Sequence, residues 1–220
     1  MNESLAREEI CRVGKSLFDR GYVHATAGNI SVRLDDGYLI TPTDACLGFL
    51  DPAALARVDG DGRQLSGERA SKTLVLHRAI YEAALRFDGG TRCVIHTHSA
   101  HAVALSLRCQ EAELLPPITP YFVMKVGHVP LALYQRPGAP ETADEVARLI
   151  CHYGDSGRAL RAVMLQRLGP NVWHDSPAAA MAVLEELEET ARLMQLAQGP
   201  CPTLSEPQIE ELRRNFGARW

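Results

Sequence analysis

Two histidines stand one residue apart at the end of a short apolar segment, and a third follows closely. They are His96, His98 and His101. Side chains alternate between the two faces of a strand, so His96 and His98 point the same way if residues 92–97 form a strand. Paired imidazoles are typical ligands of divalent transition metals, whereas His101 would lie on the following turn. The spacing therefore predicts a metal site, and the alternative is a strand end that is merely polar.

Three loops rich in small polar residues could form an anion-binding pocket. Glycine and asparagine in the first loop permit backbone angles that aim N–H groups at a ligand. Hydroxyl groups in the other two loops, and the N-terminus of the helix that the third loop begins, also favour negative charge. A lysine there would add a full cation, although each loop alone could instead be a turn with a helix cap. The loops are residues 26–31, 41–44 and 70–73, and the side chains or glycines concerned are Gly28, Asn29, Thr43, Ser71 and Lys72.

The elements that would position these residues alternate between helices and strands. Apolar residues recur at helical spacing from Leu5 onward, and Gly21 ends that helix. Residues 35–37 (Asp-Asp-Gly) mark a tight turn between two strands, and residues 88–90 interrupt the helix before the histidine strand. Helices are expected over about residues 5–18, 71–87, 141–153, 178–196 and 206–215, and strands over 29–33, 38–41, 92–97, 129–134 and 162–166.

This alternation indicates a layered α/β domain. The hairpin-type turns favour an antiparallel or mixed sheet over a doubly wound parallel one. A chain of 220 residues can fold around one core, so we expect a single domain over residues 1–220 with a C-terminal tail from about residue 199.

Composition excludes several classes of function. The formal net charge of -4 gives no electrostatic reason to expect a nucleic-acid partner. The six cysteines form no Cys-x-x-Cys pair, which argues against a zinc ribbon or a disulfide framework and favours reduced thiols in the cytoplasm. The N-terminus lacks a signal-peptide pattern and no window reaches about 18 apolar residues, so we expect no membrane span. The glycine-rich signatures of dinucleotide and P-loop nucleotide sites are also missing.

Five segments together resemble the class II aldolase and adducin-head family, over about residues 5 to 196. The resemblance implies one divalent metal ion per subunit, usually zinc, that polarises the carbonyl group of a phosphorylated sugar. It also implies a three-layer α/β/α fold with a central, mainly antiparallel or mixed sheet, and a homotetramer with active sites between subunits. The segments are TAGNIS at 26–31, ITPTD at 40–44, the helix from Ser71 to His77, IHTHSAH at 95–101, and the segment from Tyr121 to Gly127.

Four stretches resemble one branch of this family, whose members decarboxylate 3-oxo-tetronate 4-phosphates. These stretches are ITPTDACLGFLDP, SGERASKT, LPPITPYFVMKVGHVPL and RPG. The implied substrate is a phosphorylated sugar acid, and the implied products are dihydroxyacetone phosphate and carbon dioxide. Carried over by position, the resemblance implies His96 and His98 as metal ligands, Gly28, Asn29, Thr43, Asp44, Ser71 and Lys72 as phosphate-binding residues, and Tyr121 as an acid or proton donor.

Two of these roles have alternatives. Without the resemblance, Tyr121 would be a structural residue in an apolar strand. Lys72 could bind the phosphate group, or it could hold the substrate carboxylate until carbon dioxide leaves.

Two positions depart from the family pattern. Thr73 occupies the catalytic place where the family has an acidic residue, and Leu168 occupies the place of the third metal histidine. Aldol cleavage needs a base, whereas a β-keto acid loses carbon dioxide once its carbonyl is polarised. The change at Thr73 therefore favours a decarboxylase.

The change at Leu168 requires another metal ligand, because catalytic zinc usually has three from the protein. His128 is the leading candidate, since its segment continues from Tyr121 toward the same site, although it could be a polar strand end. His101 and His174 are weaker candidates. The remaining histidines, His24, His77 and His152, are expected at the surface or in packing.

Two other functions remain open from the sequence. A sugar-phosphate aldolase or epimerase of the same family would need a carboxylate from elsewhere, such as Glu68. An adducin-like assembly module without metal would account for the missing third histidine. Metal analysis combined with a decarboxylation assay separates the three hypotheses.

Overall fold

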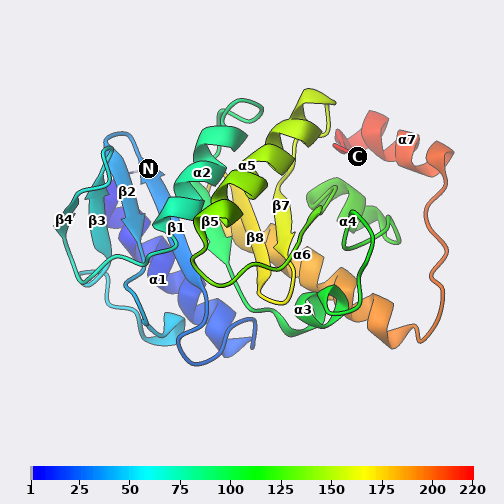
Figure 1. Cartoon of the computed structure of the whole chain (residues 1–220). Coiled ribbons are helices and arrows are strands. Elements are labelled where there is room, and N and C mark those ends of the chain that lie inside the picture. The colour runs from blue at the N-terminus through cyan, green and yellow to red at the C-terminus, as the bar shows by residue number, and fades with distance from the viewer. Residues whose placement is uncertain (1) are drawn as a thin grey trace.

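An eight-stranded mixed sheet runs through the centre of the protein (Figure 1). The computed structural model describes residues 2–220. The strand order is β4-β3-β2-β1-β5-β8-β7-β6, and neighbours are antiparallel except for the parallel pair β6 and β7. The strands are β1 (Asn29–Leu34), β2 (Gly37–Ile40), β3 (Ala56–Asp59), β4 (Gln64–Ser66), β5 (Cys93–His96), β6 (Leu131–Ala132), β7 (Ala162–Leu165) and β8 (Gly169–His174). The helices are α1 (Glu3–Asp19), the short η1 (Leu47–Phe49), α2 (Leu74–Ala84), α3 (Ala100–Ser106), α4 (Pro120–Lys125), α5 (Pro140–Asp155), α6 (Pro177–Leu196) and α7 (Glu206–Phe216).

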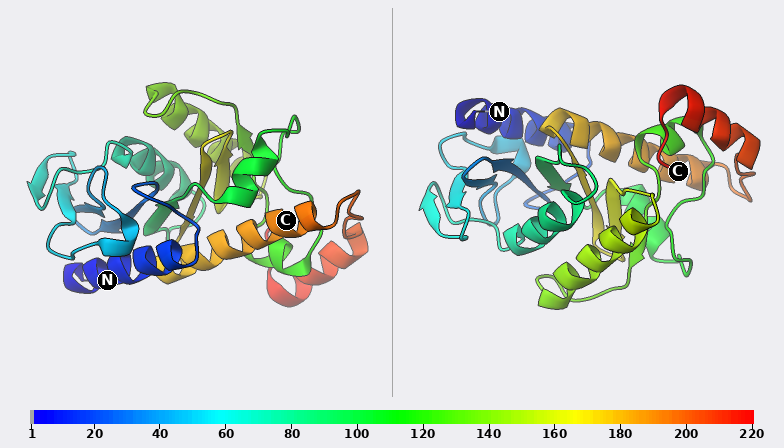
Figure 2. Two further views of the ribbon diagram at one scale, coloured as in Figure 1. Left: turned by 90° about the horizontal axis from the view of Figure 1, so that it is seen from below. Right: turned by 90° about the horizontal axis from the view of Figure 1, so that it is seen from above.

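Helices cover both faces of the sheet. α2 and α5 lie on the face toward the viewer in Figure 1, and Figure 2 shows α1 and α6 along the opposite face. Alternate residues of β5 reflect this division. Cys93 and Ile95 belong to the core on the side of α1 and α6, and Val94 belongs to the core on the side of α2 and α5. The expected three-layer α/β/α fold with a mixed, mainly antiparallel sheet is confirmed.

Local sequence signals explain where the two longest helices begin. Leu5 N–H donates to the Asn2 side chain at 2.8 Å and so caps α1. Ser176 caps α6 by accepting from Ala179 N–H at 3.3 Å. Pro177 follows in the first turn of α6, where its missing N–H has no helical partner to lose.

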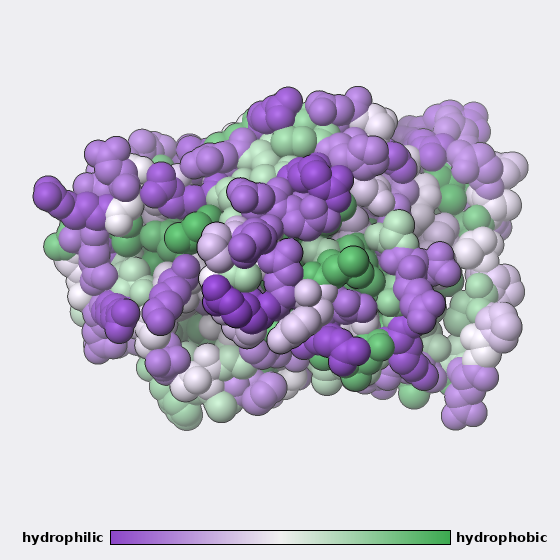
Figure 3. Space-filling model, viewed as in Figure 1, coloured by the Kyte–Doolittle hydropathy of each residue, from purple (hydrophilic) through white to green (hydrophobic). Residues whose placement is uncertain are grey.

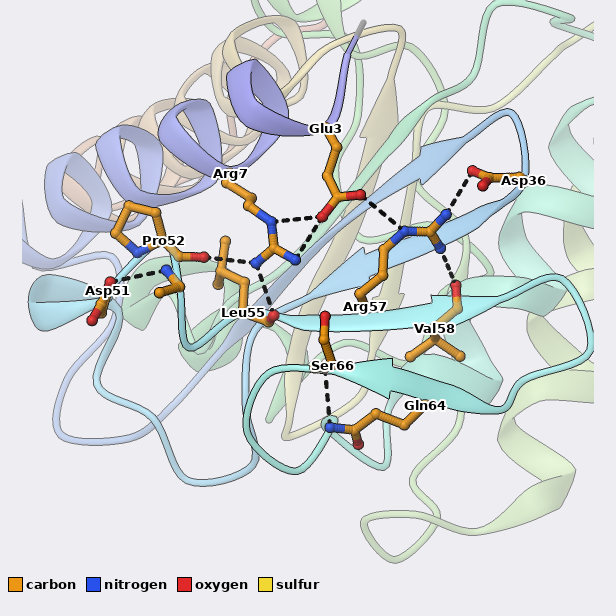
Figure 4. A network of polar contacts seen from close by, with 11 residues as sticks. Glu3, Arg7, Asp36, Asp51, Pro52, Leu55, Arg57, Val58, Gln64 and Ser66 are labelled. Atoms are coloured by element: carbon orange, nitrogen blue, oxygen red, sulfur yellow. Dashed lines mark hydrogen bonds and ion pairs between the residues drawn. The ribbon is translucent and has the colours of Figure 1, made fainter.

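A charged network fixes the N-terminus of α1 to the edge of the sheet (Figure 4). Arg57 of β3 is only 6% exposed, and its guanidinium pairs with Glu3 at 3.3 Å and with Asp36 at 2.6 Å. It also donates to the Val58 carbonyl at 2.6 Å. Arg7 donates to two loop carbonyls at 2.7 and 3.0 Å. Because a buried cation is stable only when paired and hydrogen-bonded, this network holds α1, β3 and the β1–β2 turn together.

Several elements differ from those expected. The strands β3, β4 and β8 were not predicted: β4 is exposed throughout and lacks alternation, and β8 begins with Gly169, Pro170 and Asn171, which are poor strand formers. The strand expected over 129–134 is reduced to the two residues of β6. Surface side chains are mixed in character, with apolar groups in small separate patches on the face of Figure 3. Among residues 2–220, no helix combines the length and apolarity that a bilayer span requires.

The segment after residue 199 folds back onto the protein through α7. Ile209 of α7 is buried, and α7 packs on α4. The Trp220 ring lies edge-on to Phe122 of α4, with 5.9 Å between the centroids. The C-terminal segment thus supports α4, the helix that carries Tyr121.

Candidate metal and phosphate site

His96 and His98 lie together at the end of β5, in the middle of the sheet. Their ring centroids are 5.1 Å apart, and the ring planes meet at 68°. His96 pairs with Asn29 of β1 on one side and with Asn171 of β8 on the other. His98 lies in the loop after β5 and is only partly buried. The pair thus extends from a buried strand end toward solvent.

A backbone carbonyl holds His96 in one orientation. Its Nδ1 lies 3.0 Å from the Pro170 carbonyl oxygen. A carbonyl can only accept, so the neutral ring carries its proton on Nδ1 and its lone pair on Nε2. Metal-binding histidines almost always donate their other ring N–H in this way.

Both imidazoles are neutral near pH 7. Burial, and after it the charge of His98, lowers the pKa of His96 to about 4, although the bond to Pro170 acts in the opposite direction. Burial also lowers the pKa of His98, with a further contribution from the charge of His24. Metal ions bind neutral imidazole, so this donor pair fits a divalent transition metal at neutral pH.

Three loops meet at this end of the sheet. Thr41 ties the second loop to β1, because its hydroxyl accepts from Ile30 N–H at 3.2 Å and its own N–H donates to the Ile30 carbonyl at 3.0 Å. Thr43 ties the second loop to the third: its N–H donates to the Arg69 carbonyl at 2.8 Å, and its hydroxyl donates to the Ala70 carbonyl at 2.9 Å. The structure therefore brings together the three expected loops, residues 26–31, 41–44 and 70–73.

Gly28 allows the first loop to lie against the histidine strand. Its φ is +85°, and a Cβ atom there would lie 2.9 Å from the His96 carbonyl oxygen and 2.8 Å from Val23 Cγ1. Asp44 in the second loop also has a positive φ, +58°. Backbone in this conformation can direct successive N–H groups to one side, which suits an anion.

The third loop ends in a turn, and α2 begins at Leu74 rather than at Ser71. Ser71 Oγ lies 2.8 Å from Thr73 Oγ1, so two hydroxyl groups bond each other there. Lys72 is exposed, which leaves its ammonium group available to an anion. The position of the family's acidic residue thus holds a neutral hydroxyl group beside a cation.

Tyr121 belongs to a helix and not to the strand that its apolar surroundings suggested. Phe122 N–H donates to the Thr119 side chain at 3.2 Å, and Pro120 occupies the first turn, so the sequence begins α4 here. Tyr121 is 62% exposed. α4 packs on α6 and α7 and lies away from β2 in Figure 1. Its phenol is therefore presented to solvent rather than to the imidazole pair of the same chain.

His128 is held away from the pair. Two strands, β8 and β7, separate β5 from β6, the strand that follows His128. Its Nδ1 lies 3.0 Å from both carboxylate oxygens of Glu113, and its ring stacks on Trp220 with 4.2 Å between centroids. Tyr153 donates to the same carboxylate at 2.8 Å. In this conformation His128 belongs to a separate buried polar cluster.

Leu168 lies in the β7–β8 turn, next to the histidine segment. The following residue, Gly169, packs so closely that a Cβ atom would lie 1.9 Å from the Thr97 carbonyl oxygen. The Leu168 side chain packs on the core beneath α2 and α5. Within residues 2–220, no three His, Cys, Asp or Glu side chains form a group that could hold a metal ion as they stand.

Unpartnered polar groups surround His96, and the sequence did not reveal them. Asn29 Oδ1, His77 Nε2 and both polar side-chain atoms of Asn171 are buried without a hydrogen-bond partner in the described part of the chain. His77 Nδ1 lies 2.8 Å from the Ser31 hydroxyl. Burial, and then the charge of His96, lowers the pKa of His77 to about 3. Asn171 lies in a strand that was not expected, so no pattern could place it here.

The mixed sheet with helices on both faces defines the class, a three-layer α/β/α protein, in which an imidazole pair lies beside three polar loops. The family model of the class II aldolase and adducin N-terminal domain matches residues 8–195, and the chain belongs to this family.

Relatives match nearly the whole chain. The 3-oxo-tetronate 4-phosphate decarboxylase of Cupriavidus necator is 52% identical over 225 residues, which cover 99% of each chain. The protein of the same name from Escherichia coli K12 is 40% identical over 215 residues, or 96% of each chain. Among solved structures, Escherichia coli YgbL has a TM-score of 0.86 at 39% identity and covers 96% of this chain and 99% of its own. L-fuculose-1-phosphate aldolase from Thermus thermophilus has a TM-score of 0.74 at 29% identity, over 92% of this chain and 100% of its own.

Proposed function

We propose that the protein is a carboxy-lyase that converts a 3-oxo-tetronate 4-phosphate to dihydroxyacetone phosphate and carbon dioxide, with a divalent metal ion at His96 and His98. The observation that carries this proposal is a neutral imidazole pair at the same end of the sheet as three anion-binding loops, with a hydroxyl group at Thr73. Two relatives named for this activity match nearly the whole chain, which supports the same choice.

The three loops bind the phosphate group. Gly28 and Asp44 provide the positive-φ backbone that turns N–H groups toward an anion. Ser71 adds a hydroxyl group, and the exposed Lys72 adds a positive charge. These contacts hold the reacting end of the substrate near the imidazole pair.

The substrate is a β-keto acid, with the carboxylate at C1 and the ketone at C3. When bound by the two imidazoles, the metal ion, which we take to be zinc, supplies positive charge to the C3 carbonyl oxygen. The C1–C2 bond breaks, C1 leaves as carbon dioxide, and the electron pair passes to C2 and the C3 oxygen. A proton then adds to C2 to give dihydroxyacetone phosphate.

Thr73 suits this reaction because no base is needed. A carboxylate at this position would repel both the carboxylate and the phosphate of the substrate. The Ser71–Thr73 hydroxyl pair, 2.8 Å apart, keeps the position polar but neutral. Glu68, the alternative carboxylate, is exposed, and its backbone N–H donates to the Ala54 carbonyl at 2.9 Å.

Tyr121 donates the proton to C2 from a neighbouring subunit of a homotetramer. Its exposure on α4 supports this assignment, because the phenol is available to a second chain.

We place the protein in the cytoplasm. All six cysteines are free thiols, which fits a reducing environment.

The test is a decarboxylation assay on protein reconstituted with zinc. With a 3-oxo-tetronate 4-phosphate as substrate, carbon dioxide and dihydroxyacetone phosphate should appear in equal amounts, and the His98→Ala variant should form neither. L-fuculose 1-phosphate is the control substrate, from which we expect no aldehyde. Release of aldehyde without carbon dioxide would replace this proposal with an aldolase.

A further inference from the structure

We infer that His24 is the third protein ligand of the metal ion, in place of the histidine that the family pattern has at position 168. The inference rests on the metal site of the proposed function and adds a ligand that lies on a different element. It starts from the distances between imidazole rings.

The three rings of His24, His98 and His96 form a continuous series. His24 lies edge-on to His98, with 6.3 Å between centroids and 72° between planes. His98 lies edge-on to His96 at 5.1 Å and 68°. Two imidazoles on one tetrahedral zinc ion, with Zn–N bonds of about 2.1 Å, have centroids about 5 Å apart. The His96–His98 spacing already meets this value, and the His24–His98 spacing exceeds it by about the movement that one side-chain rotation gives.

The backbone of the His24 loop is fixed against the histidine strand. Gly28, at the end of the loop, leaves no room for a Cβ atom between the His96 carbonyl oxygen and Val23. Ala27 N–H donates to the His24 carbonyl at 2.9 Å, which closes a tight turn. The intervening Ala25 has a φ of +48°. Only the His24 side chain, which is exposed, has to rotate.

Other histidines are already engaged by carboxylates. His101 Nδ1 lies 2.9 Å from Glu188, and His174 Nδ1 lies 3.0 Å from Asp175. His128 is bonded to Glu113 in its own cluster. Within residues 2–220, His24 has no such carboxylate partner, so its ring can turn toward the ion at little cost.

The experiment measures metal binding by the full-length protein, without reference to turnover. Zinc affinity is obtained by competition with a chromophoric chelator, and the geometry is read from the visible spectrum of the cobalt(II)-substituted protein. His24→Ala should weaken zinc binding at least about tenfold and should change the cobalt spectrum. Loss of a residue that only hydrogen-bonds to a metal ligand already lowers metal affinity by about 10- to 100-fold. His152→Ala, which removes an exposed histidine on α5, is the matched control and should change neither.

A second substitution tests the same geometry in the opposite direction. Leu168→His in the His24→Ala background should restore zinc affinity, because residue 168 adjoins the same pair. Wild-type affinity and an unchanged cobalt spectrum in His24→Ala would overturn the inference while leaving the decarboxylase proposal in place. Wild-type protein that binds no zinc would overturn both. Zinc binding that depends on His24, without decarboxylation, would support the inference and reject the proposed function.

Discussion

At the scale of single residues, the site is distinguished by which positions are charged. The two imidazoles are neutral, the hydroxyl groups of Ser71 and Thr73 bond each other, and the exposed Lys72 adds a positive charge beside them. A substrate that carries both a phosphate and a carboxylate is dianionic or more, so Lys72 should contribute mainly to binding.

Lys72→Gln should raise KM for the phosphorylated substrate by about 10- to 100-fold, since a hydrogen bond to a charged group contributes about 1.5–3 kcal/mol. Steady-state kinetics of the zinc-loaded protein measure this change. Lys72→Arg keeps the charge and should retain most of the affinity. An unchanged KM with a large loss of kcat would instead assign Lys72 to the loss of carbon dioxide.

His77 should make the metal-free protein less stable in acid. Its pKa is about 3 in the folded protein and about 6.5 in the unfolded chain, so between these values only the unfolded chain takes up the proton. The free energy of unfolding should fall as pH decreases from about 6.5 to 3, by about 1.4 kcal/mol per pH unit for this group. Urea titrations at several pH values from 7 to 4 measure this dependence. The free energy of unfolding of His77→Asn should change less steeply with pH than that of the wild-type protein. Equal slopes in the two proteins would mean that His77 is not the group that resists protonation.

At the scale of elements, the site depends on a loop that folds back onto a strand. Gly28→Ala would place a methyl group against the His96 carbonyl oxygen at a φ of +85°. It should destabilise the protein by about 2–4 kcal/mol, the sum of about 1 kcal/mol of backbone strain and about 1–3 kcal/mol for the forced displacement of the loop. Gly21→Ala is the matched control, because its φ is +75° and no atom of the residues that the structure describes lies within 4 Å of the added Cβ atom. Chemical denaturation should show a loss of only about 1 kcal/mol for the control.

The sequence reveals those parts of the site that depend on local geometry. His96 could be predicted at the end of a strand from the apolar run before it, and the three loops follow from their residue types. His98 lies near His96 as expected, although it belongs to the loop after β5 and not to the strand. The neighbourhoods of His24 and His128 could not, because both depend on how distant segments pack. His24 comes near His98 only because its loop lies against β5, and His128 is held by Glu113 and Trp220. The strand β8, whose Pro170 carbonyl accepts a hydrogen bond from His96, could not be predicted either, because Pro170 and Asn171 are poor strand formers.

At the scale of the whole molecule, the proposed active site needs two chains. Tyr121 points to solvent from α4, while the imidazole pair lies at the end of β5. In the proposed homotetramer, the His96→Ala and Tyr121→Phe variants should each be nearly inactive. Tetramers reassembled from equal amounts of both should regain activity in about a quarter of their sites, where an intact histidine pair meets an intact tyrosine. Reassembled tetramers with no recovered activity would place both groups in the same chain or remove Tyr121 from the reaction.

Leu168, in the β7–β8 turn, also affects how many coordination positions of a bound cation the protein can fill. Zinc in purely structural sites is enclosed by four protein donors, whereas a working zinc keeps one coordination position open for substrate or water. A hydrocarbon side chain cannot coordinate, so Leu168 prevents the coordination sphere from closing when His24 is part of it. With both histidines present, the ion would sit in an inert cage, held tightly and unable to touch a ketone. A ligand at His24 combined with leucine at position 168 therefore leaves one coordination position of the ion open, and turnover depends on that position.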